Sequence, residues 1–178
     1  MKKALLILTA ICAGFLFSSS LTAEEVTLDH VKVKVFYSPD GGCTDALIQE
    51  INDARGEILV QAYSFTSKKI AKALVHAFKR NVDVEIVLDE GQKHEKKSMA
   101  SYLSKKGLPV YLDGKHHTAH NKVMVIDGST VITGSFNLIE AAEKENAENL
   151  LIIPAEELAD LYKANWEKHK EHSKVYKH

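Results

Sequence analysis

One short segment of the chain places a histidine, a lysine and an aspartate at fixed spacing. His120, Lys122 and Asp127 form the pattern His-x-Lys-x4-Asp. A histidine serves as a nucleophile or proton carrier and a lysine is a fixed cation, so the pair suits an anionic phosphate substrate. The apolar residues 123–126 predict a central strand that is covered on both faces. Because side chains alternate along a strand, His120 and Lys122 point the same way, about 7 Å apart, whereas Asp127 faces the other side and is predicted to be structural.

A second polar pattern, Gly-Ser-x-Asn, begins after six intervening residues, with Gly134, Ser135 and Asn137. Residues 131–133 predict a neighbouring strand that follows the turn at 127–129. This strand would deliver the Gly134 backbone, the Ser135 hydroxyl and the Asn137 amide close to the first pattern. A lone histidine or a Gly-Ser pair is usually structural, but all six positions match by chance only about once in tens of millions of starting positions.

Together, the two patterns supply most of what the hydrolysis of a phosphodiester requires. The reaction needs a nucleophile, stabilisation of charge on the non-bridging oxygens and a proton for the leaving alkoxide. Free imidazole, with a pKa of ~6.5, is available in its neutral form near neutral pH, so His120 is the candidate nucleophile. Lys122, Ser135 and Asn137 are predicted to hold the phosphate oxygens. Glu148 is the candidate to accept a hydrogen bond from the other ring nitrogen of His120 and so orient the ring.

The proton for the leaving group has no certain source within one chain, because the motif occurs once. A neighbouring histidine, His116 or His117, is one alternative. The other is the His120 of a second copy, because a two-fold dimer places identical residues face to face on its axis. We favour the homodimer, and we expect His116, His117 and Lys115 to lie on the loop 113–119 at the rim of the substrate cleft.

Strands and helices alternate around these patterns. Apolar runs with a period of two, or continuous runs, predict strands, and apolar residues on one helical face predict helices. Strands separated by helices of 10–15 residues favour an α/β fold with a mixed or mostly parallel central sheet and helices on both faces. The predicted strands are 31–37, 58–63, 82–88, 110–112, 122–126, 131–133 and 150–153, and helical patterns cover 46–54, 68–78, 93–106 and 156–170.

The composition limits the classes of protein to consider. Of the 178 residues, 45% are hydrophobic and 26% are charged, which excludes wholesale disorder. The 23 Lys and Arg residues nearly balance the 24 Asp and Glu residues, so a polyanion must be held at a local site. Six lysines form either a basic approach for a nucleic-acid backbone or merely a solvated face: Lys93, Lys96, Lys97, Lys105, Lys106 and Lys115.

The first 23 residues have the layout of a secretory signal peptide. A basic start, an apolar run over residues 4–17 and small polar residues precede Ala23, after which we expect cleavage. This predicts a periplasmic or secreted protein with one domain over residues 24–178. An uncleaved N-terminal anchor is the alternative, although the apolar run is shorter than the ~20 residues that span a bilayer. Cleavage leaves Cys43 as the single cysteine, which excludes an internal disulfide and a cysteine-based metal site.

The segment from His120 to Asn137 resembles the signature of the phospholipase D superfamily, a His-Lys-Asp arrangement followed by Gly-Ser-x-Asn. Residues 63–66, 141–149 and the closing helix with Trp166 extend the likeness over essentially all of residues 24–178. Across this length the chain is similar to the small bacterial exported endonucleases of that superfamily that resist chelators. The resemblance implies a phospholipase D-like nuclease domain, a covalent phosphohistidine intermediate that water resolves, and no metal or other cofactor.

The resemblance also implies a homodimer, because larger members carry two motif copies in one pseudo-symmetric site. The leading prediction is a non-specific endonuclease that acts on DNA, with RNA as a further candidate substrate and no stable membrane association after signal cleavage. A phospholipase D-type lipid phosphodiesterase and a non-catalytic nucleic-acid-binding or uptake protein are the alternatives. The polar loop before His120 counts against the lipid substrate. No metal site is predicted: no tight cluster of Asp and Glu surrounds the motif, and His169, His172 and His178 are expected in a frayed polar tail.

Overall fold

The structure is a computed structural model that describes residues 23–177. The predicted signal peptide lies outside the described residues apart from Ala23, and so does His178. Within residues 23–177, no helix combines the length and the apolar content that crossing a membrane requires.

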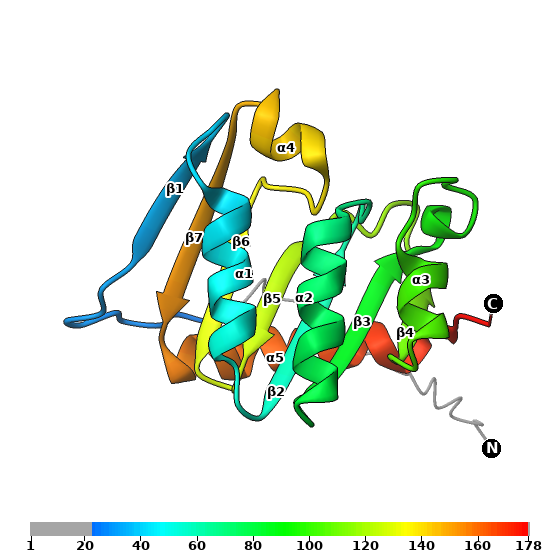
Figure 1. The fold of residues 1–178 in the computed structure, drawn as a ribbon. Coiled ribbons are helices and arrows are strands. Elements are labelled where there is room, and N and C mark those ends of the chain that lie inside the picture. Colours follow the sequence, from blue (N-terminus) through cyan, green and yellow to red (C-terminus); the bar gives the residue numbers. More distant parts are fainter. Residues whose placement is uncertain (1–22, 178) are drawn as a thin grey trace, which may run out of the picture.

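A mixed sheet of eight strands forms the centre of the described chain (Figure 1). The strand order is β1-β7-β6-β5-β2-β3-β4-β8. β2 pairs in parallel with β3, and β3 with β4, whereas the other neighbours are antiparallel. The bounds are β1 Lys34–Ser38, β2 Glu57–Ala62, β3 Asp83–Asp89, β4 Val110–Asp113, β5 Lys122–Ile126, β6 Thr130–Gly134, β7 Glu148–Pro154 and β8 Lys174–Val175.

Helices cover both faces of this sheet, which confirms the predicted fold class (Figure 1). α1 (Cys43–Asp53), α2 (Lys68–Lys79) and α3 (Ala100–Lys105) lie over one face, and α5 (Glu156–His172) crosses the other. Ser67 caps α2 as a helix-starting residue should, because its hydroxyl accepts a hydrogen bond from the backbone N–H of Ile70 at 3.4 Å.

Three short elements do not follow from the sequence patterns: the 3-10 helix η1 (Glu90–Lys93), α4 (Glu140–Lys144) and β8. Each is too short to show a repeating apolar face. The helical pattern predicted over 93–106 is only partly formed, because a loop separates η1 from α3. α3 therefore begins at Ala100, seven residues later than the pattern predicts. The hydroxyl of Ser98 accepts a hydrogen bond from the backbone N–H of Ala100 at 3.3 Å.

The central strands are apolar on both faces because each face packs against helices. Beneath α5, the side chains of Leu59, Val87, Val125 and Val131 form a core with Trp166. The indole N–H of Trp166 donates a hydrogen bond of 2.9 Å to the carbonyl of Val60, so this buried ring pins α5 to the middle of β2. The opposite face carries the larger core beneath α1, α2 and α3.

One edge of the sheet gathers the ends of most strands. The pairings place the carboxyl ends of β1, β2, β3, β4 and β6 at the same edge as the amino ends of β5 and β7. Ligands in open α/β sheets bind outside the carboxyl ends of the parallel strands. Both polar patterns predicted from the sequence meet this edge, since Lys122 begins β5 and Gly134 ends β6.

Candidate active site

His120 and Lys122 lie together at the amino end of β5. Lys122 is the first residue of the strand and pairs with Ala62 of β2, and His120 precedes the strand by two residues. The Nζ of Lys122 donates a hydrogen bond of 2.8 Å to the carbonyl oxygen of His120. The backbone N–H of Tyr63 donates to the carbonyl of Asn121 at 2.9 Å, which extends the β2–β5 pairing up to the histidine.

Tyr63 is the residue that packs against both members of this pair. Its ring centroid lies 4.5 Å from that of His120, and the Nζ of Lys122 lies 5.1 Å from the Tyr63 ring. The imidazole and the ammonium group therefore share one side of the sheet edge. The sequence patterns do not assign Tyr63 to the site, because only the β2–β5 pairing shows that it lies beside the motif.

Gly134 and Ser135 sit where β6 comes very close to β7. Gly134 has a φ of 149°, and a Cβ at this position would lie 2.2 Å from the carbonyl oxygen of Asn149, so only glycine fits. The Oγ of Ser135 accepts hydrogen bonds from the backbone N–H of Asn149 at 3.1 Å and from its side-chain amide at 3.3 Å. Two acceptor positions of the hydroxyl are thus used, and its own hydrogen remains to be donated.

Asn137 lies on the loop that follows β6. Its Oδ1 is buried and has no hydrogen-bond partner among residues 23–177. Leaving a buried polar atom unpaired costs about 1–3 kcal/mol. Because Oδ1 can only accept hydrogen bonds, contact with a phosphate oxygen falls to the Nδ2 group of Asn137. The loop is held in place because the carbonyl of Leu138 accepts hydrogen bonds from the backbone N–H groups of Thr66 and Ser67 at 3.0 and 2.9 Å.

Glu148 does not make the predicted contact with His120. Its Oε1 accepts a hydrogen bond of 3.0 Å from the amide of Asn146, and within residues 23–177 it forms none with the imidazole. Glu148 begins β7, and β6 lies between β7 and β5, so the two backbones are roughly 10 Å apart. The charge of Glu148 acts on Lys122 instead. Burial lowers the pKa of Lys122, and the negative charge of Glu148 partly offsets this decrease.

Asp127 lies at the opposite edge of the sheet, at the far end of β5. Its carboxylate accepts hydrogen bonds from the backbone N–H groups of Arg55, Gly56 and Glu57 at 2.9, 2.7 and 2.9 Å. Burial alone would raise the pKa of Asp127, but these hydrogen bonds hold it below its usual value. The aspartate ties the β5–β6 turn to the segment between α1 and β2.

The loop 113–119 does not turn His116 toward His120. The Nδ1 of His116 lies 2.9 Å from the carboxylate of Asp113, and its ring stacks beside His169 and His172, with centroids 4.8 and 5.2 Å apart. The prediction that these two C-terminal histidines belong to a frayed tail was wrong, because both lie in α5 and both face Asp113. The sequence could not show this, since the partners are more than fifty residues apart.

Other residues of the same loop remain at the surface, and its end is fixed next to the motif. Lys115 and His117 are exposed. The carboxylate of Asp89, at the end of β3, accepts a hydrogen bond of 2.8 Å from the backbone N–H of Ala119. Asp89 therefore holds the residue that directly precedes His120, a positioning role that no sequence pattern predicts.

Comparison with known proteins decides the family. Residues 47–170 match the family model described as cardiolipin synthase, PLD-like domain. The chain belongs to the phospholipase D superfamily. It is 41% identical to the phospholipase D of Rickettsia bellii over 139 residues, which cover 78% of this chain and 69% of the relative.

Two solved structures resemble most of this chain. Nuc from Salmonella typhimurium, a phospholipase D family member, matches with a TM-score of 0.80 and 38% identity over 83% of this chain and 99% of Nuc. NucT from Helicobacter pylori matches with a TM-score of 0.77 and 28% identity over 82% of this chain and 99% of NucT. The chain is accordingly a phosphodiesterase hydrolase of the phospholipase D superfamily.

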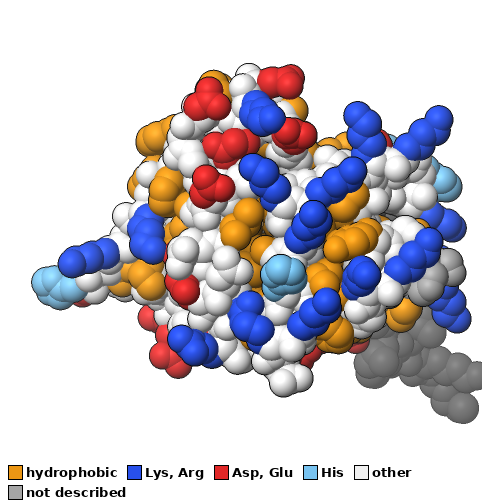
Figure 2. Space-filling view, in the orientation of Figure 1, with side chains coloured by type: hydrophobic (Ala, Val, Ile, Leu, Met, Phe, Trp, Pro, Cys, Tyr) orange, Lys and Arg blue, Asp and Glu red, His pale blue; other side chains and the backbone are white. Residues whose placement is uncertain are grey.

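A groove of about 980 Å³ runs beside the active-site edge of this superfamily member. Lys96 and Lys97, two of the six lysines noted in the sequence, line it together with Lys68, Lys69 and Lys144. Acidic residues line it as well, among them Glu95 and three glutamates of the α4 region: Glu140, Glu143 and Glu145. Figure 2 shows lysine and arginine side chains spread over the α2 and α3 side of this face, with acidic side chains gathered over α4.

Proposed function

We propose that this phosphodiesterase is an exported, metal-independent endonuclease that cleaves DNA, with RNA as a further substrate. The observation that carries the proposal is the arrangement at the start of β5. The ring of His120 makes no hydrogen bond with any residue in the range 23–177 and lies against Tyr63, beside the ammonium group of Lys122. A nucleophile whose ring nitrogens are unengaged, next to a fixed cation, suits attack on a phosphodiester.

The chemistry divides into two balanced steps. A ring nitrogen of neutral His120 attacks phosphorus and forms an N–P bond, while the P–O bond to the leaving alkoxide breaks and the alkoxide takes a proton from a general acid. Water then attacks the phosphohistidine, the N–P bond breaks, and the same acid, now a base, receives the proton of the water. Lys122, the Ser135 hydroxyl and the Asn137 amide hold the non-bridging oxygens as charge develops.

The general acid is the His120 of a second copy in a homodimer. His116 is engaged with Asp113 and two helix histidines, so it is poorly placed to protonate a leaving group at His120. His117 is exposed on the same loop and makes no hydrogen bond within the described residues. A two-fold axis through the motif edge would bring two copies of His120 and Lys122 to one phosphate.

Several features favour nucleic acid over a lipid headgroup. The large apolar side chains that are exposed within residues 23–177 are Leu28, Val33, Val35, Tyr37 and Val175, and none of them lies on the loop before His120. That loop presents Lys115 and His117 to solvent instead. The similarity to the phospholipases D of Rickettsia keeps a lipid phosphodiesterase as the second candidate.

Incubation with four substrates in excess EDTA tests the proposal. Plasmid DNA, single-stranded DNA, RNA and phospholipid vesicles are each treated with the full chain and with the His120→Asn variant as the matched control. We expect cleavage of DNA by the wild-type chain and none by the variant. Cleavage of lipid alone would overturn the nuclease proposal, and activity that disappears when divalent ions are chelated would overturn the metal-independent mechanism.

The covalent intermediate provides a second test, which does not depend on substrate preference. Acid-quenched enzyme that has turned over 32P-labelled substrate is expected to carry label on a histidine of the peptide that contains His120. Label that persists in the His120→Asn variant, or none in the wild-type chain during turnover, would contradict nucleophilic attack by His120.

A further inference from the structure

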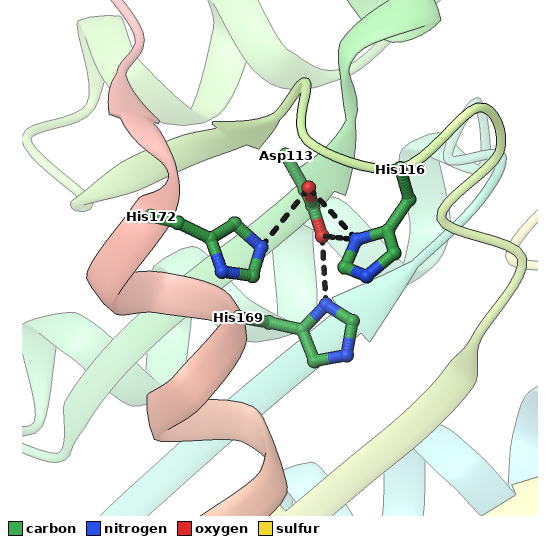
Figure 3. A group of neighbouring side chains, drawn as sticks. All are labelled: Asp113, His116, His169 and His172. Atoms are coloured by element: carbon green, nitrogen blue, oxygen red, sulfur yellow. Dashed lines mark hydrogen bonds and ion pairs between the residues drawn. The ribbon is translucent and has the colours of Figure 1, made fainter. Parts of the chain in front are cut away.

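Four side chains that the phosphodiesterase mechanism does not use converge at the carboxyl end of β4 (Figure 3). Asp113 ends the strand, His116 follows on the loop, and His169 and His172 lie about one turn apart on α5. The ligand atoms that these four residues can offer all lie within 4.8 Å of one another. The cluster joins two segments that are distant in the sequence.

Asp113 stands at the centre of the group. Its side chain is 0% exposed, and its Oδ2 lies 2.7 Å from the Nδ1 of His169 and 2.9 Å from the Nδ1 of His116. Its Oδ1 lies 3.2 Å from the Nε2 of His172. Ligand atoms around a tetrahedral zinc ion, bound at 2.0–2.1 Å, are about 3.3–3.4 Å apart. Small side-chain shifts would therefore close the group around one ion.

The Nε2 of His172 gives an independent indication. This atom is buried and forms no hydrogen bond with any described residue, although it lies near Asp113. A buried nitrogen without a hydrogen bond is costly, and a bound cation would satisfy it. Because His169 and His172 are three residues apart on α5, they project from the same helical face toward the carboxylate.

The composition of the cluster fits a metal better than a set of ion pairs. If all three imidazoles were protonated, three positive charges would surround a single carboxylate, with ring centroids 4.8–5.4 Å apart. Neutral imidazoles and one carboxylate instead form an N3O ligand set that suits Zn2+. The backbone N–H of Lys115 also donates a hydrogen bond of 3.0 Å to the Oδ1 of Asp113.

We propose that Asp113, His116, His169 and His172 bind one Zn2+ ion that joins the C-terminal helix α5 to the loop preceding His120. Four protein ligands complete a tetrahedral shell, which makes the site structural. β2 and β3 separate β4 from β5, so the ion would lie roughly 14–15 Å along the sheet from the β5 motif and would not touch the scissile phosphate. Its function is to fix the loop 113–119.

Metal binding by the full chain, stripped with chelator and dialysed, tests this site. Calorimetric titration with Zn2+ is expected to give one ion per chain, and Co2+ is expected to show the visible bands of tetrahedral coordination. The His169→Ala/His172→Ala variant is expected to bind Zn2+ at least about 100-fold more weakly. His117→Ala removes an exposed histidine of the same loop and is the matched control, with wild-type affinity for Zn2+ expected.

Thermal unfolding distinguishes the loss of zinc ligands from a variant that fails to fold. Zn2+ that binds only the folded chain, at about 100 times its Kd, lowers the ratio of unfolded to folded chains about a hundredfold. The melting temperatures of the wild-type chain and of His117→Ala should therefore rise when Zn2+ is added. Circular dichroism checks that the double variant is folded; its melting temperature should not respond to Zn2+. The proposed zinc site would be overturned if the folded double variant bound Zn2+ with unchanged affinity or if the wild-type chain bound no Zn2+. Loss of Zn2+ binding in His120→Asn alone would overturn it as well.

Discussion

We expect the ammonium group of Lys122 to determine how the activity depends on pH in the alkaline range. Burial lowers the pKa of Lys122, and the charge of Glu148 raises it only in part. An ammonium group with a lowered pKa is charged at low pH and loses its proton before pH 10.5, the ordinary value. In the proposed mechanism the charged form stabilises the phosphate oxygens, so kcat/KM should fall as the pH rises through this lowered pKa.

Two substitutions at Lys122 test this prediction. Lys122→Met should lower kcat about 10²–10³-fold, the usual loss for one group that stabilises developing charge. Lys122→Arg keeps a cation whose pKa is well above that of lysine, so its alkaline decline in kcat/KM should shift to higher pH even if its peak activity is lower. An alkaline decline at the same pH in Lys122→Arg and the wild-type chain would show that another group titrates there.

Single residues also show what the sequence could and could not reveal about the site. Spacing alone placed His120 and Lys122 on the same side, because alternation along a strand is a local property. Tyr63 and Asn149 contact the site residues across neighbouring strands, and Asp89 holds Ala119 from β3. Which strands are neighbours is not encoded locally, so these three could not be found. The same limit explains why Glu148 was assigned to His120 although β6 separates their strands.

Among the structural elements, the β5–β6 hairpin depends on Asp127 at its turn. Asp127→Ala removes the acceptor for the backbone N–H groups of Arg55, Gly56 and Glu57. Because the carboxylate is partly exposed, we expect the free energy of unfolding to fall by about 1–2 kcal/mol near neutral pH. Denaturant unfolding of the variant and of the wild-type chain measures this difference. Asp29→Ala, which removes an exposed aspartate from a turn, is the matched control with little expected change.

The pH dependence of that difference has a definite sign. Backbone hydrogen bonds outweigh burial and lower the pKa of Asp127 in the folded chain. The stabilisation is therefore present above the pKa of an unfolded aspartate, about 3.9, and is lost as the pH falls through the lower folded value. The unfolding free energies of Asp127→Ala and the wild-type chain should converge below about pH 4. A constant difference down to pH 2 would mean that the ionised carboxylate is not responsible.

The elements themselves were largely predictable, but their order in the sheet was not. The strand predicted over 122–126 coincides with β5, and the closing helix predicted over 156–170 differs from α5 by two residues at its end. Long periodic or apolar runs carry these signals locally. The insertion of β5 beside β2, and the docking of α5 on Asp113, depend on contacts between distant segments. The catalytic edge and the histidine cluster both arise from those contacts.

At the scale of the whole molecule, the two proposed sites lie at the same edge of the sheet, and one is proposed to be catalytic and the other structural. The motif with His120 and Lys122 lies where β2, β5 and β6 meet, and the cluster proposed to bind zinc lies at the end of β4. Asp89 and the loop 113–119 connect the two regions, since they hold the residue next to His120. If both proposals hold, removal of Zn2+ will lower the melting temperature while DNA cleavage in EDTA persists below that temperature.

The last prediction concerns how many chains make one active site. If a phosphate is shared by two copies of His120, a dimer of one wild-type chain and one His120→Asn chain lacks either the nucleophile or the acid. Such mixed dimers, isolated through two different affinity tags after co-expression, should turn over at less than about one-hundredth of the wild-type rate, because loss of general acid catalysis alone costs 10²–10⁴-fold.

Mixing experiments give the same answer without isolating the mixed dimers. When wild-type chains make up a fraction f of randomly paired chains, a shared site predicts activity proportional to f², whereas independent sites predict activity proportional to f. At a wild-type fraction of one quarter, the two models differ about fourfold. Activity linear in f, combined with loss of cleavage in His117→Ala, would assign the acid to the loop of the same chain and remove the need for a second subunit.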